Sequence, residues 1–213
     1  MKLFPDLEAV PECAPGSDVA YTPDAVARAC VAYLDTRGWI GGAWWEPCCG
    51  AGNWLPALQD LAPGVATELD SNALAVRLGF ARQWDALKGP PSPGFDPACI
   101  VTNPPFTCAA QLLRVCLAIP TVKTICFLVL QAWIVAPGKE QEQRLDLLWG
   151  PSARPVEQVV LYPRIAFQGP GRDGGSTDMR EYCLLIWRRQ PDGSWLAPVT
   201  TLRRLDWRSG VVQ

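Results

Sequence analysis

Asn103-Pro104-Pro105-Phe106 is a segment whose side chains and backbone could hold a planar amine. Because two consecutive prolines fix φ and restrict the backbone, the Asn103 amide and the Pro104 carbonyl would keep one orientation. Together they would offer two hydrogen-bond acceptors to an NH2 group, and Phe106 would offer an aromatic face to a planar ring. A β-turn with two prolines has the same sequence. The position of the segment, directly after an apolar run over residues 98–102, is what favours a site.

A second candidate site is the segment Glu46-Pro47-Cys48-Cys49-Gly50-Ala51-Gly52. Gly50 and Gly52 would allow the backbone to turn tightly and to approach a ligand closely, as in dinucleotide-binding turns. The G-x-G-x-x-G pattern of those turns is incomplete because residue 55 is Leu, which favours a ligand without a pyrophosphate. A tight turn between a strand and a helix, without any ligand, is the alternative interpretation.

Acidic residues lie at the ends of the next two predicted strands. Glu68 closes the strand over residues 65–69, and Asp85 follows the strand over residues 81–84. A carboxylate at the Glu68 position can accept hydrogen bonds from both hydroxyls of a ribose, Asp70 could do the same, and Asp85 could accept one from an adenine amine. A single acid at a strand end is usually only solvated. Three acids at the carboxyl edge, where ligands of α/β sheets bind, indicate a nucleoside site.

The elements that must position these residues alternate between strands and helices. Strands are expected over residues 43–46, 65–69, 81–84, 98–102, 124–130, 156–162 and 181–188, and helices from Thr22-Pro23 onward and over residues 54–61, 72–78, 109–119 and 141–149. Thr22 is expected to cap the first helix, with Pro23 in its first position. This order predicts an α/β fold with a doubly wound, mostly parallel sheet and an antiparallel edge hairpin.

The composition excludes several classes of chemistry. The 213 residues include no histidine, which removes histidine general bases, Ser-His and Cys-His pairs and most zinc sites, and no metal site is expected. The nine cysteines lie in apolar stretches, as reduced core cysteines do. No apolar run approaches the ~20 residues of a membrane span, and the first residues do not resemble a signal peptide, so a cytoplasmic protein is expected.

The charges are distributed unevenly along the chain. Residues 1–106 carry 6 basic and 12 acidic side chains, whereas residues 107–213 carry 13 basic and 9 acidic ones. The front half would suit a cationic small molecule, and the back half a polyanion such as a nucleic acid. Ordinary variation in composition would account for the same asymmetry.

Taken in order, these motifs resemble those of the amino-methyltransferases, in particular the N6-adenine DNA methyltransferases in which the cofactor motif comes first. Residues 46–52 are similar to the E-P-x-C-G-x-G cofactor motif, and residues 103–106 to the catalytic D/N-P-P-Y/F motif. Tyr21-Thr22-Pro23 resembles the motif before the first strand, Glu68-Leu69-Asp70 the ribose motif and Trp84-Asp85 the adenine motif. The resemblance covers roughly residues 20–135, and the order of motifs is more specific than any one of them.

The resemblance implies a Rossmann-like fold with a seven-stranded sheet, S-adenosylmethionine as cofactor and a target adenine flipped out of DNA. Thr22 would meet the methionine part of the cofactor. The N6 lone pair of adenine is delocalised into the ring, so the amine is a poor nucleophile. Acceptors that take hydrogen bonds from both of its N–H groups favour a more pyramidal nitrogen, while the cofactor supplies an activated methyl group. Positioning then contributes much of the rate.

The later hairpin, from Pro163 to Phe167 and from Arg180 to Tyr182, resembles that of small phage or prophage-type adenine methyltransferases. By this resemblance Phe167 would pack against the flipped base, although an aromatic residue in a strand commonly belongs to the core. DNA contacts are expected from the arginines around the loop over residues 169–178, namely Arg164, Arg172 and Arg180. Residues 1–20 are expected to form a tail, and residues 21–213 a single catalytic domain without a separate large target-recognition domain.

Three alternatives keep the fold and change the function. The acceptor could be adenine in RNA or a glutamine side chain in a protein, since both present an NH2 on a planar group. The chain could also be a non-catalytic nucleic-acid-binding subunit. The Glu-Pro-x-Cys-Gly motif favours adenine, the basic second half favours a nucleic acid, and intact motifs at residues 46–52 and 103–106 favour an enzyme.

Overall fold

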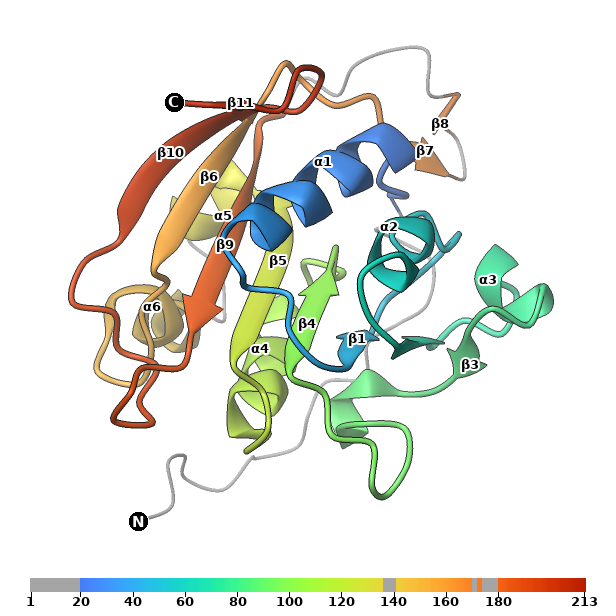
Figure 1. The fold of residues 1–213 in the computed structure, drawn as a ribbon, viewed down its shortest axis with the longest axis horizontal. Helices are drawn as coiled ribbons and strands as arrows, with labels where there is room; N and C mark the ends of the chain where they lie inside the picture. The colour runs from blue at the N-terminus through green and yellow to red at the C-terminus, as the bar shows by residue number, and fades with distance from the viewer. Residues whose placement is uncertain (1–19, 136–140, 170–171, 174–179) are drawn as a thin grey trace.

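The computed structural model describes residues 20–135, 141–169, 172–173 and 180–213, which form an α/β structure around one large sheet (Figure 1). The sheet has nine strands in the order β11-β10-β6-β9-β5-β4-β1-β2-β3, and β7 and β8 form a separate hairpin. Apart from Ala20, the tail predicted over residues 1–20 lies outside the described residues.

The strands of the large sheet are β1 (Trp44–Glu46), β2 (Gly64–Glu68), β3 (Arg82–Gln83), β4 (Cys99–Thr102), β5 (Thr124–Leu130), β6 (Glu157–Tyr162), β9 (Tyr182–Arg188), β10 (Thr201–Asp206) and β11 (Val211–Val212). The small hairpin consists of β7 (Gln168–Gly169) and β8 (Arg172–Asp173). The helices are α1 (Asp24–Thr36), α2 (Leu55–Gln59), α3 (Leu74–Arg77), the 3-10 helix η1 (Ala86–Lys88), α4 (Ala109–Ala118), α5 (Gln131–Val135) and α6 (Gln141–Trp149). Each predicted strand and helix is present, with small shifts at the ends.

The sheet is mostly parallel and is wound outward in both directions from β1. β1 pairs with β2 on one side and with β4 on the other, and the pairs β2–β3, β4–β5 and β6–β10 are also parallel. β9 runs antiparallel between β5 and β6. The antiparallel pairing of the two late strands is therefore confirmed, but they lie inside the sheet rather than at its edge.

The expected number of seven strands is wrong, because the sheet continues beyond β6. β10 pairs with β6 along Thr201 to Asp206, and β11 pairs with β10. Most side chains of β10 stay half or fully exposed, and only Leu205 is buried. This strand is positioned by backbone hydrogen bonds to β6, and it lacks the apolar run that marks a buried strand in a sequence.

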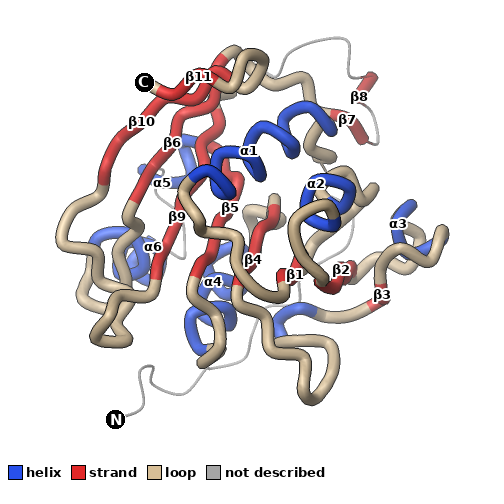
Figure 2. Tube along the Cα trace, in the orientation of Figure 1, coloured by secondary structure: helices blue, strands red, loops and turns tan. Residues whose placement is uncertain are grey.

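Helices cover both faces of the sheet (Figure 2). Buried side chains of α1 and α2 pack with one face, and those of α4, α5 and α6 pack with the other. β5 contributes to both layers, with Cys126 and Leu128 in the first and Ile125 and Phe127 in the second. The central strands are thus buried on both faces, as the apolar runs predict.

The start of α1 differs from the expectation. The helix begins at Asp24, no side chain caps it, and the Pro23 carbonyl accepts hydrogen bonds from the N–H groups of Val26 and Ala27. The Thr22 hydroxyl is buried and has no hydrogen-bond partner among the described residues. The capping prediction is wrong because Thr22 belongs to a segment that lines the candidate site described below.

Two expectations from the composition can be compared with the structure. The eight cysteines within the described residues are all free, and seven of them are buried, so the prediction of reduced core cysteines is confirmed for this part of the chain. Among the same residues, none of the helices combines the length and the apolar character required to cross a bilayer.

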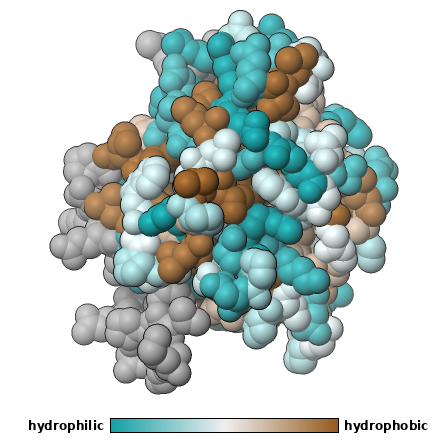
Figure 3. Space-filling view, turned by 60° about the vertical axis from the view of Figure 1, so that its left-hand side comes forward, coloured by the Kyte–Doolittle hydropathy of each residue, from teal (hydrophilic) through white to brown (hydrophobic). Residues whose placement is uncertain are grey.

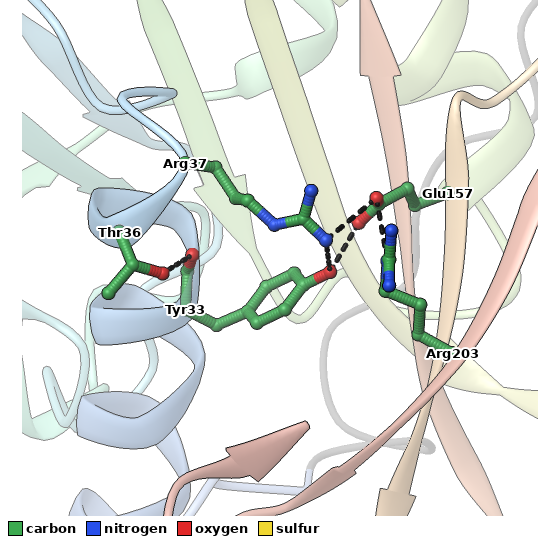
Figure 4. Close-up of polar contacts among 5 residues, drawn as sticks. All are labelled: Tyr33, Thr36, Arg37, Glu157 and Arg203. Carbon is green, nitrogen blue, oxygen red and sulfur yellow. Dashed lines mark hydrogen bonds and ion pairs between the residues drawn. The ribbon is translucent and has the colours of Figure 1, made fainter. Parts of the chain in front are cut away.

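A buried carboxylate joins α1 to the β6–β10 pair (Figure 4). Glu157, only 4% exposed, accepts a hydrogen bond from the Tyr33 hydroxyl, and its Oε1 lies 3.0 Å from both Arg37 Nη2 and Arg203 Nε. Burial, followed by the hydrogen bond to Glu157, raises the pKa of Tyr33 above its ordinary value. The cluster therefore connects β10, which extends the sheet, to the helix that covers the adjacent face.

Replacing Glu157 with alanine is expected to lower the free energy of unfolding by roughly 1–3 kcal/mol, because a buried hydroxyl and two guanidinium groups lose their common acceptor. Asp24→Ala is the control, since it removes an exposed ion pair with Arg28 (2.8 Å) from the same helix and should change stability little. Urea unfolding would measure both. Equal effects of the two substitutions would contradict a stabilising role for the Glu157 cluster.

Candidate active site

A hollow opens at the carboxyl ends of β1 and β4, where the predicted cofactor and catalytic segments meet. It is lined by residues from three separate parts of the chain, namely Ala20, Tyr21, Thr22, Cys48, Cys49, Gly50, Ala51, Asn53, Trp54 and Asn103. The order of β1 and β4 as neighbours in the sheet brings the glycine turn and Asn103 together. We refer to these ten residues as the site hollow.

Residues 20–22 form one wall of the site hollow and are held mainly through their backbone. Tyr21 N donates to Gln168 O (2.7 Å), and Gln168 N donates to Tyr21 O (3.0 Å). Asn103 Nδ2 donates to Ala20 O (2.8 Å), and Asn53 Nδ2 donates to Thr22 O (2.7 Å). Four hydrogen bonds therefore fix this segment against the glycine turn, β4 and the start of β7.

The glycine turn is shaped by two residues in the left-handed region. Gly50 has φ +52° and Gly52 has φ +88°. A Cβ atom at Gly50 would lie 2.8 Å from the ring of Tyr21, so the aromatic side chain packs directly on the turn. Glycine is needed at position 50 for its backbone conformation and for this close approach.

Glu68 connects the glycine turn to the end of β2. Its Oε2 accepts a hydrogen bond from Gly50 N (2.9 Å), and its Oε1 accepts from Leu69 N (2.7 Å) and Asp70 N (3.1 Å). A carboxylate offers about four acceptor sites, so these three bonds leave capacity on Oε2. Asp70 accepts from Asn72 N through Oδ1 (2.8 Å).

The third predicted acid also lies at a strand end. Asp85 follows β3 and accepts a hydrogen bond from Leu87 N (3.1 Å), which caps η1. Its Oδ2 lies 3.9 Å from Lys88 Nζ. The three acids thus occupy successive positions along the carboxyl edge, as expected. None of the three acids is among the ten residues that line the site hollow.

Acidic groups give the site hollow a negative environment. Burial is the main reason why the pKa of Tyr21 is raised above its ordinary value, and the carboxylates of Glu68 and Asp70 add to the effect. Both carboxylates disfavour the negative charge that the phenol would acquire on ionisation. The same field would stabilise a positively charged ligand in this position.

Glu46 is fully buried beneath the site hollow. Its Oε1 accepts a hydrogen bond from Cys48 N (3.0 Å). Within the part of the chain that the structure describes, its Oε2 and the Thr102 hydroxyl oxygen are buried without hydrogen-bond partners. Burial raises the pKa of Glu46 to about 8, and the nearby Thr102 hydroxyl and Cys48 N–H oppose this shift only in part. Glu46 is therefore largely protonated at neutral pH. Since Thr102 directly precedes Asn103, this carboxyl group of the first motif lies next to the start of the second.

The Asn103–Phe106 segment leads from β4 toward α4. Because Asn103 Nδ2 is used by Ala20 O, Oδ1 is the atom of this amide that can accept a further hydrogen bond. Phe106 is half-buried, and its ring centroid lies 6.4 Å from that of Tyr182. The Tyr182 ring in turn lies 4.4 Å from Phe167. The segment therefore carries an amide acceptor at its start and, at its end, one ring of a group of three aromatic rings.

The predicted nucleic-acid contacts are only partly brought together. Phe167 is 2% exposed, so its ring is covered in this conformation and contacts Tyr182 rather than the surface. Arg164 follows β6, Arg180 precedes β9, and both are exposed at the carboxyl edge. Arg172 lies in β8, but its side chain is outside what the structure describes, as is most of the loop over residues 169–178.

Several residues of the site were not predicted from the sequence. Asn53 adjoins Gly52, and its amide orients Thr22. Tyr182 links Phe106 to Phe167, and Gln168 pairs with Tyr21. Asn53 could have been noticed as a polar side chain within the turn. The contacts of Tyr182 and Gln168 join segments far apart in the chain, and no local pattern signals them.

S-adenosylmethionine fits the residues of the site hollow. Thr22 is only 3% exposed, and its hydroxyl has no hydrogen-bond partner in the described ranges, so a polar group of a ligand would satisfy it. The glycine turn allows close approach, and Glu68 retains acceptor capacity for a ribose hydroxyl. The negative environment suits a sulfonium group.

Comparisons with known proteins identify the class of fold. No protein-family model and no curated protein matches the sequence. Among solved structures, a modification subunit of a putative type I restriction enzyme from Vibrio vulnificus is 18% identical, with a TM-score of 0.59, and the match covers 91% of this chain and 48% of that chain. A type I restriction-modification system methyltransferase subunit from Streptococcus thermophilus is 12% identical, with a TM-score of 0.60, covering 88% and 47%. The 23S rRNA methyltransferase ErmE is 19% identical, with a TM-score of 0.56, covering 80% and 70%.

These similarities show that the chain has the Rossmann-like fold of S-adenosylmethionine-dependent methyltransferases. The predicted fold class is confirmed in its α/β, mostly parallel character and corrected in its number of strands. The chain spans about half the length of the two type I subunits that it matches.

The raised pKa of Glu46 predicts a specific pH dependence of stability. Between about pH 4.5 and 8 the folded protein keeps a proton on Glu46 that the unfolded chain releases. The free energy of unfolding should therefore fall as the pH rises through this window, by at most about 1.4 kcal/mol per pH unit. Glu46→Gln cannot titrate, so it should remove this contribution and gain stability relative to the wild type at pH 8. Urea unfolding at pH 5, 6.5 and 8 measures the difference, and parallel profiles for the two proteins would show that folded Glu46 is ionised.

Proposed function

We propose that this chain transfers a methyl group from S-adenosylmethionine to the N6 amine of adenine in DNA, as an adenine-specific DNA methyltransferase. The observation that supports this most strongly is that Asn103, at the carboxyl end of β4, lines the same hollow as Tyr21 and Gly50. An acceptor for an amine thus lies beside the residues that fit a nucleoside cofactor. Residues 21–213 would act as one catalytic domain of the small phage type.

The cofactor would bind across the site hollow and along the ends of β2 and β3. Thr22 would form a hydrogen bond to the methionine part of the cofactor. Glu68 Oε2 and Asp70 would accept hydrogen bonds from the ribose hydroxyls, and Asp85 would accept one from the adenine amine. Glu46, Pro47, Cys48 and Leu69 would shape this site through the turn and the strand ends. When bound, the cofactor supplies a methyl group that is already activated by a sulfonium.

The protein would then hold and orient the target amine. Asn103 Oδ1 and the Pro104 carbonyl would accept hydrogen bonds from its two N–H groups, which favours a nitrogen with an available lone pair. Pro104 and Pro105 restrict the backbone, so both acceptors keep their directions. Phe106 would stack on the flipped base, supported from behind by Tyr182 and Phe167. Positioning for in-line transfer supplies much of the rate, and no histidine is required.

DNA is the acceptor that the surroundings of the site favour. Arg164 and Arg180 are exposed at the carboxyl edge and would contact phosphates, with Arg172 from the neighbouring loop. Two of the similar structures are type I restriction-modification subunits, and one is an rRNA methyltransferase. Transfer of tritiated methyl groups to duplex DNA, single-stranded DNA, RNA and protein in parallel tests the proposal. Labelling of RNA or protein without labelling of DNA would overturn it.

Glu68→Ala is expected to weaken binding of S-adenosylhomocysteine by roughly 1.5–3 kcal/mol through loss of a charge-assisted hydrogen bond to the ribose. Because Glu68 also holds Gly50, calorimetry should compare S-adenosylhomocysteine with its 2′-deoxy and 3′-deoxy analogues in both proteins. A ribose contact predicts that removal of the contacted hydroxyl costs less in Glu68→Ala than in the wild type. The same cost in both proteins for each analogue would mean that Glu68 acts only on the turn.

Asn103→Ala is expected to abolish methyl transfer while leaving cofactor affinity within a few-fold, because one of two acceptors for the amine is lost. Asn53→Ala is a matched control, since it removes the equivalent amide bond to the same segment (2.7 Å to Thr22 O, against 2.8 Å to Ala20 O). At saturating cofactor, Asn53→Ala should retain most of the turnover. Turnover and melting temperature should be measured on the same samples. Normal turnover by folded Asn103→Ala would falsify the proposed role of this amide.

A further inference from the structure

Two arginine–aromatic pairs lie at the carboxyl ends of β6 and β10. The guanidinium carbon of Arg204 lies 4.1 Å from the centroid of the Tyr162 ring, and that of Arg208 lies 5.2 Å from the Trp207 ring. Tyr162, Arg204 and Arg208 are exposed, and Trp207 is half-buried. We refer to these four residues as the β6–β10 platform.

Backbone and side-chain hydrogen bonds hold the two halves of the β6–β10 platform together. Tyr162 is the last residue of β6 and lies opposite Asp206, the last residue of β10. Trp207 N donates to Tyr162 O (2.9 Å), and Trp207 Nε1 donates to Pro163 O. The aromatic rings are thus fixed to the sheet, and each guanidinium rests on a ring, which reduces the conformational freedom that it would lose on binding a ligand.

The β6–β10 platform lies on the same edge of the sheet as the proposed catalytic segment. β6 and β10 are parallel to each other and, through antiparallel β9, to β5 and β4. β6 is three strands and β10 four strands away from β4 in the sheet order, which corresponds to roughly 14 and 19 Å. This separation equals about four to six base pairs of B-form DNA.

The charge of this edge changes sign along the sheet. Around the ends of β2 and β3 it carries Glu68, Asp70 and Asp85. Around the ends of β6 and β10 the described residues include the bases Arg164, Arg204 and Arg208 and the acids Glu181 and Asp206. The Asp206 carboxylate accepts a hydrogen bond from Arg208 N (3.0 Å). Figure 3 turns the β10 side of the molecule forward and shows hydrophilic and hydrophobic residues interleaved across it.

Guanidinium groups next to aromatic rings are suited to nucleic acids. Arginine binds phosphate oxygens in a planar, bidentate geometry, and the aromatic ring against which each guanidinium lies restricts its orientation. A partner rich in acidic side chains would also match the charge, but the platform lies on the edge at which the proposed DNA acceptor would approach Asn103. The charge and the position together therefore favour a nucleic acid.

We propose that the β6–β10 platform is a second contact surface for the DNA substrate, which binds the sugar–phosphate backbone about four to six base pairs from the flipped adenine. This inference rests on the proposed function and deepens it. It also assigns a role to β10, one of the two strands beyond the expected seven. This strand, which carries Arg204, would serve to lengthen the contact with the duplex.

Binding of a fluorescent duplex, in the presence of S-adenosylhomocysteine and at several salt concentrations, tests this surface. Arg204→Gln should raise Kd roughly three- to tenfold and reduce the slope of log K against log salt by about one unit. The matched control is Lys123→Gln, because Lys123 is exposed just before β5, at the opposite edge of the sheet. It should keep Kd within about twofold and the slope unchanged. On duplexes that end two base pairs beyond the adenine on either side, Arg204→Gln should bind like the wild type.

The outcomes separate this inference from the proposed function. If the wild type methylates DNA and Arg204→Gln binds long duplexes with unchanged Kd and salt slope, the proposed DNA contact at the platform is overturned and the proposed methyltransferase activity stands. If RNA alone is bound and methylated and Arg204→Gln weakens RNA binding, the surface is supported and the DNA acceptor is overturned. A wild-type protein that binds no nucleic acid overturns both.

Discussion

Residues 20–22 cross the carboxyl ends of β1 and β4, and four hydrogen bonds to their backbone fix them there. Two of these bonds come from side-chain amides, one from Asn53 directly after the glycine turn and one from Asn103 in the predicted catalytic motif. Because Tyr21 packs directly on Gly50 and pairs with Gln168, the same short segment closes the turn and joins it to the later strands. Without this convergence the proposed cofactor and amine sites would not share one hollow.

Two buried carboxyl groups lie at different junctions of the sheet, and their environments give them different chemistry. Glu157 accepts hydrogen bonds or ion pairs from a tyrosine and two arginines, and these compensate its burial. Glu46 has no cationic partner among the described residues, and burial raises its pKa to about 8. The neutral form removes the cost of a buried charge beneath the cofactor turn. Glu157 thus connects β10 to α1, whereas Glu46 lies beneath the glycine turn and accepts a hydrogen bond from Cys48 N.

The carboxyl edge of the sheet combines two kinds of surface. Its acidic half surrounds the glycine turn and suits a cationic nucleoside, and its basic, aromatic half extends from Arg164 to Arg208. Asn103 and Phe106 lie after β4, where the halves meet. A cationic methyl donor would approach this point from the acidic half, and a polyanionic acceptor would approach it from the basic half. Neither ligand would then meet side chains of its own charge.

The sequence by itself determined the features that depend on local patterns. Apolar runs marked β4 and β5, the glycines marked the turn before α2, and alternation of strands and helices gave the fold class and the edge at which Glu68, Asp85 and Asn103 lie. Tertiary structure decided what depends on distant pairing. Thr22 lines the site hollow instead of capping α1, and Phe167 is buried against Tyr182. The sheet also contains two further strands, β10 and β11. Such contacts form between segments far apart in the chain, and a half-exposed strand held by backbone hydrogen bonds leaves no periodic signal in its side chains.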